Sequence, residues 1–248
     1  MVESASVMEE EVRRFDALGQ DWWNPSGPMA PLHRMNPIRL AWLLERIAAH
    51  FGRTPKQDEA PLENLEILDI GCGAGLLSEP LFRLGARVIG LDPAPTSIAV
   101  ARAHALETGA EVVYRQGTIE EMAQEPAKFD VVLALEVVEH VKDLQDFLLT
   151  ATSVLRPGGL LVLSTLNRTL QSFALAIVTA EYVLHWLEPG THRWEQFVTP
   201  AELKMALKQA GMENFLSQGL SYNPLSRHWS LSKDCNVNYF SSASKPRI

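Results

Sequence analysis

Residues 65–92 read LEILDIGCGAGLLSEPLFRLGARVIGLD, and this stretch decides the fold. It begins with a mainly apolar run, 67–70, of the kind that forms a buried parallel strand. A glycine cluster follows over 71–75, then a helical pattern over 76–84 and a second apolar run that ends on Asp92. Strand, glycine loop, helix, strand and terminal acid in this order form one βαβ unit of a nucleotide-binding sheet. An acid at the tip of the second strand can accept hydrogen bonds from both ribose hydroxyls of a nucleoside.

The rest of the chain continues this alternation of strands and helices. It predicts an α/β, doubly wound, Rossmann-like fold, a mostly parallel twisted sheet with helices on both faces. We expect an amphipathic lead-in helix over 3–18 and a helix over 37–50, with Asn36 as its cap and Pro37 in its first turn. Further strands are predicted at 111–114, 129–135, 160–165 and within 216–240, and further helices at 93–108, 143–155, 170–187 and 199–211, the last opened by a capping box of Thr199 and Glu202.

We interpret the chain as one domain, 1–248, with four parts. Residues 1–51 form an N-terminal helical and aromatic cap, and 65–165 form the nucleoside-binding core. An insertion after the fifth strand, 166–198, contains the long apolar helix 170–187, which the basic sheet does not require. Residues 199–248 supply the C-terminal helix and strands.

The composition excludes several classes of protein. The 248 residues carry a net charge of −8, which argues against nucleic acid as the main partner because phosphate binding depends on clustered Lys and Arg. Cys72 and Cys235 lie far apart, so we expect a reducing compartment rather than a disulfide framework. The acidic N-terminus lacks the apolar stretch of a secretory signal. No run of 18 uncharged apolar residues suggests a membrane span.

The glycine loop has the form D-x-G-C-G-A-G rather than the G-x-G-x-x-G of dinucleotide-binding enzymes. Because a dinucleotide needs the third glycine to seat its pyrophosphate, an NAD-dependent dehydrogenase is disfavoured. The loop resembles the first motif of class I S-adenosylmethionine-dependent methyltransferases. On this interpretation the backbone at Gly71 and Gly73 lies against the methionine part of the donor, Asp92 binds its ribose, and the loop 117–120 lies near its adenine. The alternatives are a glycine turn that only packs helix on strand and an ordinary surface turn at 117–120.

A second cluster of reactive side chains follows the predicted strand 129–135. It consists of Glu136, Glu139 and His140. Loops at the carboxyl ends of strands form the ligand crevice in open α/β sheets. Two carboxylates and an imidazole within five residues suit Mg²⁺. His140 could instead act as a general base, since histidine titrates near neutral pH. The third interpretation is a structural turn in which His140 bonds the backbone and the acids face water.

Several longer motifs resemble the ubiquinone-biosynthesis O-methyltransferase family, and they cover the chain from about Phe15 to Phe240. Most of them are absent from other methyltransferases. They are WW-x-P-x-GP at 22–28, PLHRMNP-x-R at 31–39, STLNR at 164–168, AEY at 180–182, GTH at 190–192, NP at 223–224 and D-x-x-VNY at 234–239.

The resemblance implies methylation of a catechol-type hydroxyl on polyprenylated intermediates. Two steps are implied, 3-demethylubiquinol to ubiquinol and 2-polyprenyl-6-hydroxyphenol to 2-methoxy-6-polyprenylphenol. The positions that match the family's S-adenosylmethionine-binding residues are Arg39, Gly71, Asp92 and Leu135, to which we add Gly73. Those that match residues associated with Mg²⁺ are Glu136, Glu139 and His140, of which we expect His140 and Glu136 to be catalytic.

A prenylated substrate partitions into the bilayer, so the enzyme must collect it there. Apolar side chains of 170–187 could lie against lipid headgroups, or this helix could be a lid or a core helix. We expect a cytoplasmic protein, peripheral on the inner face of a bacterial inner membrane or on the matrix side in a mitochondrion. Its expected partners are the substrate and a membrane surface or biosynthetic complex, without nucleic acid. The alternative function is a non-catalytic scaffold of the same fold, but the intact loop and the cluster at 136–140 favour catalysis.

Overall fold

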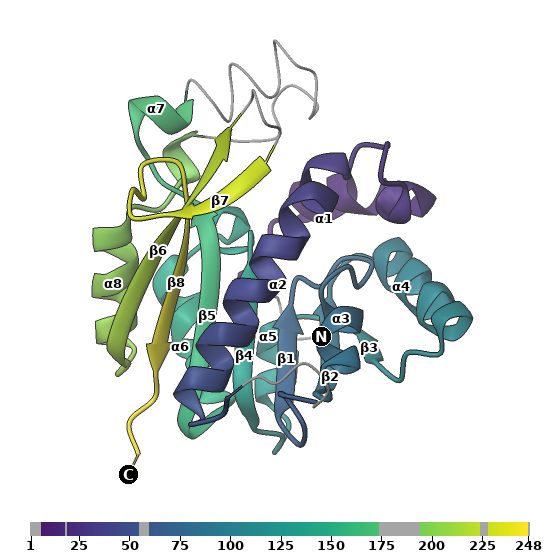
Figure 1. The fold of residues 1–248 in the computed structure, drawn as a ribbon, viewed down its shortest axis with the longest axis horizontal. Coiled ribbons are helices and arrows are strands. Elements are labelled where there is room, and N and C mark those ends of the chain that lie inside the picture. Colours follow the sequence, from purple (N-terminus) through teal and green to yellow (C-terminus); the bar gives the residue numbers. More distant parts are fainter. Residues whose placement is uncertain (1–5, 18, 55–59, 174–193, 224–227, 248) are drawn as a thin grey trace.

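The computed structural model describes residues 6–17, 19–54, 60–173, 194–223 and 228–247, which form one eight-stranded sheet with helices on both faces (Figure 1). The strands are β1 (Glu66–Ile70), β2 (Arg87–Asp92), β3 (Val113–Gln116), β4 (Phe129–Leu135), β5 (Leu155–Leu166), β6 (Glu213–Asn223), β7 (His228–Ser232) and β8 (Asn238–Ser244). The α-helices are α1 (Glu9–Asp16), α2 (Ala30–His50), α3 (Ser78–Arg83), α4 (Pro95–Thr108), α5 (Ile119–Ala123), α6 (Leu144–Ser153), α7 (Leu170–Ser172) and α8 (Pro200–Gln209). Short 3₁₀ turns are η1 (Gly19–Trp23), η2 (Val138–His140) and η4 (Trp194–Gln196).

The sheet has the order β3-β2-β1-β4-β5-β8-β6-β7. The first five strands in this order are parallel, so their carboxyl ends meet at one edge. β8 pairs antiparallel with both β5 and β6, and β7 pairs antiparallel with β6. The predicted doubly wound α/β fold is therefore confirmed. The order reverses between β1 and β4, and open α/β sheets bind ligands at such a switch point.

The apolar residues of the central strands alternate between two cores, one on each face of the sheet. Along β4, Val132 and Ala134 pack with α5, α6 and α8, whereas Val131 and Leu133 pack with α2 and α3. Figure 1 shows α2 lying lengthwise across its face of the sheet. Burial on both faces explains why this strand is continuously apolar instead of alternating with polar residues.

Helix α2 begins seven residues before the predicted start at Pro37. The prediction of Asn36 as its cap is wrong, because the Nδ2 of Asn36 donates a hydrogen bond to the carbonyl of Leu76 at 3.0 Å. Pro31 occupies the first turn in its place. Pro37 lies inside the helix and costs it one backbone hydrogen bond. The longer helix extends across the cavity described below.

Three other boundaries near the N-terminal half differ from the prediction. The lead-in helix is shorter than 3–18 and spans Glu9–Asp16. β3 begins at Val113 rather than at 111, because its pairing with β2 runs from Ile89↔Val113 to Asp92↔Gln116. Ile119, predicted to lie in a loop, begins α5.

The connection from α6 to β5 also differs. The helix predicted over 143–155 ends at Ser153, and the strand predicted to start at 160 begins at Leu155. Leu155 already pairs with Phe129, and an irregularity in the register then brings Leu160 opposite Val131. The residues predicted to separate helix from strand therefore belong to the strand.

The C-terminal third holds the predicted kinds of element, but with shifted bounds, since α8 ends at Gln209 rather than 211, β6 starts at Glu213 rather than 216 and β8 ends at Ser244 rather than 240. α8 starts at the predicted capping box, in which the amide of Glu202 donates to Oγ1 of Thr199 at 3.2 Å and the amide of Thr199 donates to the carboxylate of Glu202 at 2.9 Å. The tail supplies the last strands, β6 to β8. Most of the predicted helix 170–187 lies outside the described residues. Among those described, no helix is long and apolar enough to cross a membrane.

Candidate active site

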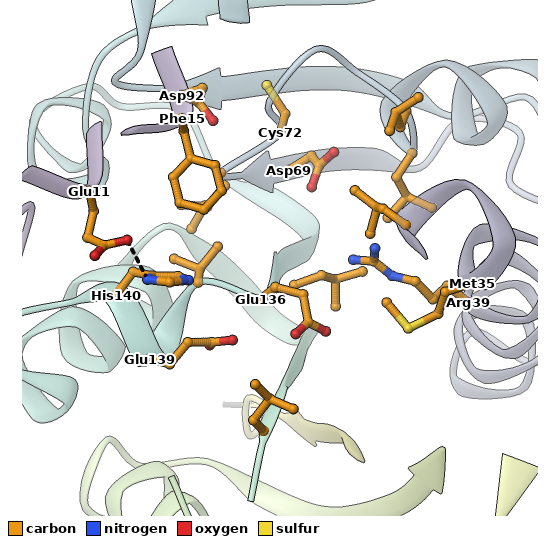
Figure 2. A pocket seen from close by; sticks show the side chains of 18 of the residues that line it. Glu11, Phe15, Met35, Arg39, Asp69, Cys72, Asp92, Glu136, Glu139 and His140 are labelled. Carbon is orange, nitrogen blue, oxygen red and sulfur yellow. Dashed lines mark ion pairs between the residues drawn. The ribbon is translucent and has the colours of Figure 1, made fainter. Parts of the chain in front are cut away.

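A cavity of about 570 Å³ lies at the carboxyl edge of the parallel strands. This volume is within the range of about 300–1,000 Å³ found for small-molecule pockets. The strand ends and the glycine loop form one wall, and α1, α2 and the β6–β7 hairpin contribute the others. Figure 2 shows the labelled side chains converging on this space. Seven of the predicted site residues line the cavity, namely Arg39, Gly71, Asp92, Leu135, Glu136, Glu139 and His140.

Asp92 stands at the tip of β2 and is 8% exposed. Its Oδ2 accepts a hydrogen bond from the amide of Gly73 and its Oδ1 accepts one from the amide of Ala94, both at 2.9 Å. Burial raises the pKa of Asp92, and the two amide hydrogen bonds limit that rise. Each carboxylate oxygen can accept a second hydrogen bond. The group is therefore held rigidly and can still bind two hydroxyls of a ribose.

Both the backbone conformation and the neighbouring side chains require glycine at positions 71 and 73. Their φ angles are +70° and +54°, which favour glycine. A Cβ on Gly71 would lie 2.6 Å from Cγ2 of Val137, and one on Gly73 would lie 2.6 Å from the ring of Trp22. Gly73 is not part of the cavity lining, to which Trp22 belongs. Contact between Gly73 and the methionine part of a donor therefore stays a prediction.

Arg39 reaches from α2 toward the cavity and is 4% exposed (Figure 2). Its Nε has no hydrogen-bond partner among the described residues. Burial lowers the pKa of Arg39, although the charges of Glu136, Asp69 and Glu139 oppose that shift. A buried guanidinium with a donor left over is suited to bind a carboxylate.

Asp69, the acid that opens the glycine-loop motif, also lines the cavity. Its Oδ2 accepts a hydrogen bond of 2.6 Å from Oγ of Ser78. Burial raises the pKa of Asp69 to about 6, against the lowering effects of Ser78 and Arg39. The group is thus mostly ionised at neutral pH, as holding a ligand's amino group requires.

Glu136 and Glu139 follow β4 and are each held by a hydroxyl of β5. Glu136 has φ +57°, a left-handed conformation that costs a residue with a side chain about 1–2 kcal/mol. Oγ of Ser164 donates to its carboxylate at 2.6 Å. Oγ1 of Thr165 donates to the carboxylate of Glu139 at 2.8 Å. Burial, and after it the charge of Glu136, raise the pKa of Glu139 to about 7.

His140 pairs with Glu11, a residue of the N-terminal helix. Nδ1 of His140 lies 3.0 Å from Oε2 of Glu11, and the two side chains are 16% and 13% exposed. The distance is that of an ion pair, although the ring N–H is not well aligned for a hydrogen bond. Burial lowers the pKa of His140, but Glu11 and the charge of Glu139 outweigh burial and hold it above the usual 6.5. Figure 2 shows the opposite edge of the ring turned toward the cavity.

The three residues predicted to bind magnesium do not come together as one ligand set. Nδ1 of His140 is directed to Glu11, and each of the two carboxylates has one oxygen bonded to a hydroxyl of β5. Within the described ranges, no group of three or more His, Cys, Asp or Glu side chains is arranged to hold a metal ion. Binding of Mg²⁺ by these residues stays a prediction.

The N-terminal segment, residues 6–17 and 19–23, contributes to the cavity wall; a cap was predicted over 1–51, but the contact of this segment with His140 was not. Val7 forms a β-bridge with Val141, and the amide of Lys142 donates to the carbonyl of Ser6 at 3.0 Å. This places Glu11 and Phe15 in the cavity wall, with the Phe15 ring edge-on to His140 at 5.4 Å between centroids. One signal in the sequence could have revealed this contact. Glu11 lies at helical spacing with the apolar residues of the lead-in helix, so it falls on the helix face that packs against the rest of the protein.

Residues 117–119, predicted to lie near an adenine, line the cavity beside Asp92. The amide of Gly117 donates to the Asp92 carbonyl at 3.1 Å, which fixes the loop to the tip of β2. Glu120 instead accepts a hydrogen bond of 3.1 Å from the amide of Ser6. The loop is therefore more than a surface turn, and its contact with adenine stays a prediction.

Comparison with known proteins gives the family. A family model described as a methyltransferase domain matches residues 68–163. Two relatives, the ubiquinone biosynthesis O-methyltransferases of Methylobacterium nodulans and Azorhizobium caulinodans, are each 54% identical to this chain. The matches cover 97% of this chain and 96% and 94% of the relatives. The chain belongs to the ubiquinone biosynthesis O-methyltransferase family. It is an S-adenosylmethionine-dependent O-methyltransferase, and the resemblance stated from its motifs is confirmed.

Solved structures support the fold of this O-methyltransferase. Magnesium protoporphyrin IX methyltransferase from Synechocystis, with bound S-adenosylhomocysteine, superposes with a TM-score of 0.60 at 21% identity over 96% of this chain and 93% of that one. The plantazolicin methyltransferase BpumL, also with S-adenosylhomocysteine, gives 0.61 at 15% identity over 97% and 100%. At such identities the likeness concerns the class I methyltransferase fold. S-adenosylmethionine is the methyl donor of this fold and of this family.

Proposed function

We propose that this enzyme methylates a catechol-type hydroxyl of polyprenylated intermediates at two steps, 3-demethylubiquinol to ubiquinol and 2-polyprenyl-6-hydroxyphenol to 2-methoxy-6-polyprenylphenol. The observation that carries the proposal is the shared cavity. Asp92, a buried acid at the tip of β2, and His140, a histidine with an ionic partner, both face it. A donor held at one wall and a hydroxyl placed at the other are what an O-methyl transfer needs.

The protein can bind the methyl donor through polar side chains that can still form further hydrogen bonds. Asp92 would hold the ribose hydroxyls and Arg39 the carboxylate of the methionine part, with Asp69 near its amino group. S-adenosylmethionine supplies the methyl group as a sulfonium, and the transfer is an in-line displacement. The protein therefore contributes mainly alignment of the two reactants and exclusion of water. The N-terminal segment is placed to do the latter, because Glu11, Phe15 and Trp22 lie in the cavity wall.

His140 is proposed as the base that takes the hydroxyl proton. A phenolic hydroxyl has a pKa of about 10 and is mostly protonated at pH 7. As the O–CH₃ bond forms and the S–CH₃ bond breaks, the proton passes to the ring nitrogen that faces the cavity. The imidazolium that results is stabilised by Glu11 at the other nitrogen. Glu136, whose left-handed backbone conformation aims it from the end of β4, would orient the acceptor.

No step above depends on a metal. For Mg²⁺ to bind Glu136, Glu139 and His140 together, the three side chains would have to move closer to one another, although the ring nitrogen of His140 that faces the cavity could bind while Nδ1 stays paired with Glu11. Turnover that is lost on treatment with EDTA and restored by Mg²⁺ would support this regrouping. Unchanged turnover would leave His140 as a metal-free base.

We also propose that the enzyme acts as a peripheral protein at the inner face of the membrane, alone or in a biosynthetic complex. The support is chemical, because a polyprenylated substrate is held in the bilayer and must be collected there. Sedimentation with vesicles of bacterial phospholipid tests this, and protein that stays in the supernatant at all lipid concentrations would contradict direct binding.

The central test is transfer of a radiolabelled methyl group to a short-chain demethylubiquinol, with and without Mg²⁺. We expect labelled ubiquinol to form. Calorimetry should show binding of S-adenosylhomocysteine and no binding of NAD. A protein that binds S-adenosylhomocysteine but transfers no methyl group to either acceptor would favour the non-catalytic scaffold.

A further inference from the structure

The cavity has an apolar end that the transfer chemistry does not use. It lies between the first half of α2, which contributes Leu32 and Met35, and the β6–β7 hairpin, which contributes Leu220, Tyr222 and Trp229. We propose that this end, which we name the tail subsite, holds the isoprene units nearest the ring of the acceptor. The inference rests on the proposed function, since it concerns the same substrate.

The register of the strands explains how the hairpin reaches the cavity. The pairing of β6 with β8 stops at Leu220↔Asn238, at the carboxyl edge of the sheet. The pairing of β6 with β7 continues for three more residue pairs, to Asn223↔His228. The end of the hairpin therefore stands beyond the sheet, beside the cavity. Tyr222 and Trp229 are directly opposite each other there, with 5.1 Å between ring centroids.

The face that these rings present is the one that looks toward α2. Successive side chains of a strand alternate between faces, so Leu220 and Tyr222 point the same way. Leu220 is buried in the same core cluster as Met35 and Trp42 of α2, and Trp229 packs against that cluster. The two aromatic rings therefore continue the apolar surface of that core outward along the cavity.

The helix on the other side changes from apolar to charged along one face. Leu32, Met35 and Arg39 are spaced so that they share a face of α2. Leu32 and Met35 are apolar, while Arg39 lies deeper, near the charges of Asp69 and Glu136. The carboxylate of Asp234, which also borders the cavity, already accepts a hydrogen bond of 2.9 Å from the amide of Asn236. A ring hydroxyl thus belongs at the charged end, and a hydrocarbon substituent belongs at the apolar end.

An isoprene chain fits this end because it forms no hydrogen bonds and binds by removing apolar surface from water. Trp229 and Tyr222 are partly exposed while lining the cavity, so a hydrocarbon placed against them would bury apolar surface of both partners. The tail subsite would therefore favour prenylated acceptors over the bare catechol and would fix the ring's orientation relative to the donor.

The test compares kcat/KM for a demethylubiquinol analogue without a tail with that for analogues carrying one and two isoprene units, all below their aggregation concentrations. For the wild-type enzyme kcat/KM should rise with each unit. In Trp229→Ala the ratio of prenylated to tail-less kcat/KM should fall about tenfold, the lower range for loss of hydrophobic pocket contacts. Trp229→Phe, which keeps an aromatic ring, should recover part of the ratio and serves if the alanine variant does not fold.

Leu231→Ala is the matched control. Leu231 lies on the same hairpin, opposite Leu220, but is 39% exposed and is not part of the cavity wall. Its ratio should stay within about twofold of wild type, since it would lose no contact with a tail. A Trp229→Ala ratio equal to that of wild type, or a Leu231→Ala ratio that falls as far, would overturn the tail subsite.

The experiment also separates this inference from the proposed function. A wild-type enzyme that methylates the tail-less acceptor with no gain from isoprene units would retain the reaction and lose the tail subsite. A wild-type enzyme that methylates none of the acceptors would overturn both.

Discussion

Replacing Glu11 by glutamine removes the charge that faces His140 and leaves the size of the side chain unchanged. The pair is mostly buried and its atoms are 3.0 Å apart, so we expect a loss of about 1.5 kcal/mol of stability, somewhat more than the roughly 1 kcal/mol at which exposed ion pairs reach their upper range. For a protein of this size that corresponds to a fall in Tm of about 3–6 °C.

The loss should depend on pH in a defined direction. Glu11 holds the pKa of His140 above the usual 6.5, so the contribution of His140 is complete below that value and disappears as pH rises through the raised pKa. Burial raises the pKa of Glu11, but its bond to His140 lowers it overall below 4.5, so its contribution disappears as pH falls through the lowered pKa. The difference in Tm between wild type and Glu11→Gln should therefore be largest between pH 4.5 and 6.5 and smaller at pH 9, where only the pairing of Glu11 with Arg14 at 3.2 Å remains.

The same substitution should change the pH profile of methyl transfer. Without Glu11, burial lowers the pKa of His140, so the acid limb of kcat should move to lower pH. The value of kcat on the pH-independent plateau should fall about tenfold, which is less than the roughly 100-fold or greater effect of removing a general base altogether. Glu10→Gln, an exposed glutamate on the same helix, is the control and should change neither quantity. The reasoning would be refuted by an equal loss of Tm at pH 5.5 and pH 9, or by an unmoved acid limb.

Three further predictions concern other parts of the site. Asp92→Ala should weaken binding of S-adenosylhomocysteine by about 3 kcal/mol, or about 100-fold, in calorimetry, and equal affinity would remove its role at the ribose. Gly73→Ala should lower Tm by clearly more than Gly109→Ala. Both residues have positive φ, but only at Gly73 would the added Cβ lie 2.6 Å from a ring, that of Trp22. Equal losses of Tm in thermal melts would contradict this. Thr165→Val should destabilise the protein by about 1 kcal/mol more at pH 8 than at pH 5. The lost hydroxyl donates a hydrogen bond to Glu139, whose pKa of about 7 means that it is ionised only at the higher pH. A loss of stability that does not change with pH would count against this prediction.

The sequence predicted the parts of the fold that depend on local chemistry. The glycine loop, the acid at Asp92 and the apolar run of β4 follow from local backbone and packing requirements, and all three lie where they were expected. The start of α2 was missed because Asn36 and Pro37 form a good local cap, whereas the side chain of Asn36 bonds Leu76, forty residues away. Nothing in the local sequence reveals such a partner.

The candidate site was predictable to a similar degree. Residues at the ends of strands could be placed in one cavity, since parallel strands end at the same edge. The partner of His140 could not be predicted. Glu11 reaches His140 only because the N-terminal helix packs there, and two other glutamates stand next to Glu11 in the sequence. The tail subsite was hidden for a related reason, since it depends on how far β6 and β7 pair beyond β8.

The position of β8 has a consequence for how the protein is made. β8 lies between β5 and β6, although residues 213–232 are synthesised before it. Until residues 238–244 emerge, the nascent chain presents β5 as an open edge and has no place in the sheet for the β6–β7 hairpin. Such open edges pair readily with other chains. Variants that slow the insertion of β8 should therefore reduce the yield of protein from cells more than they reduce the stability of the finished enzyme.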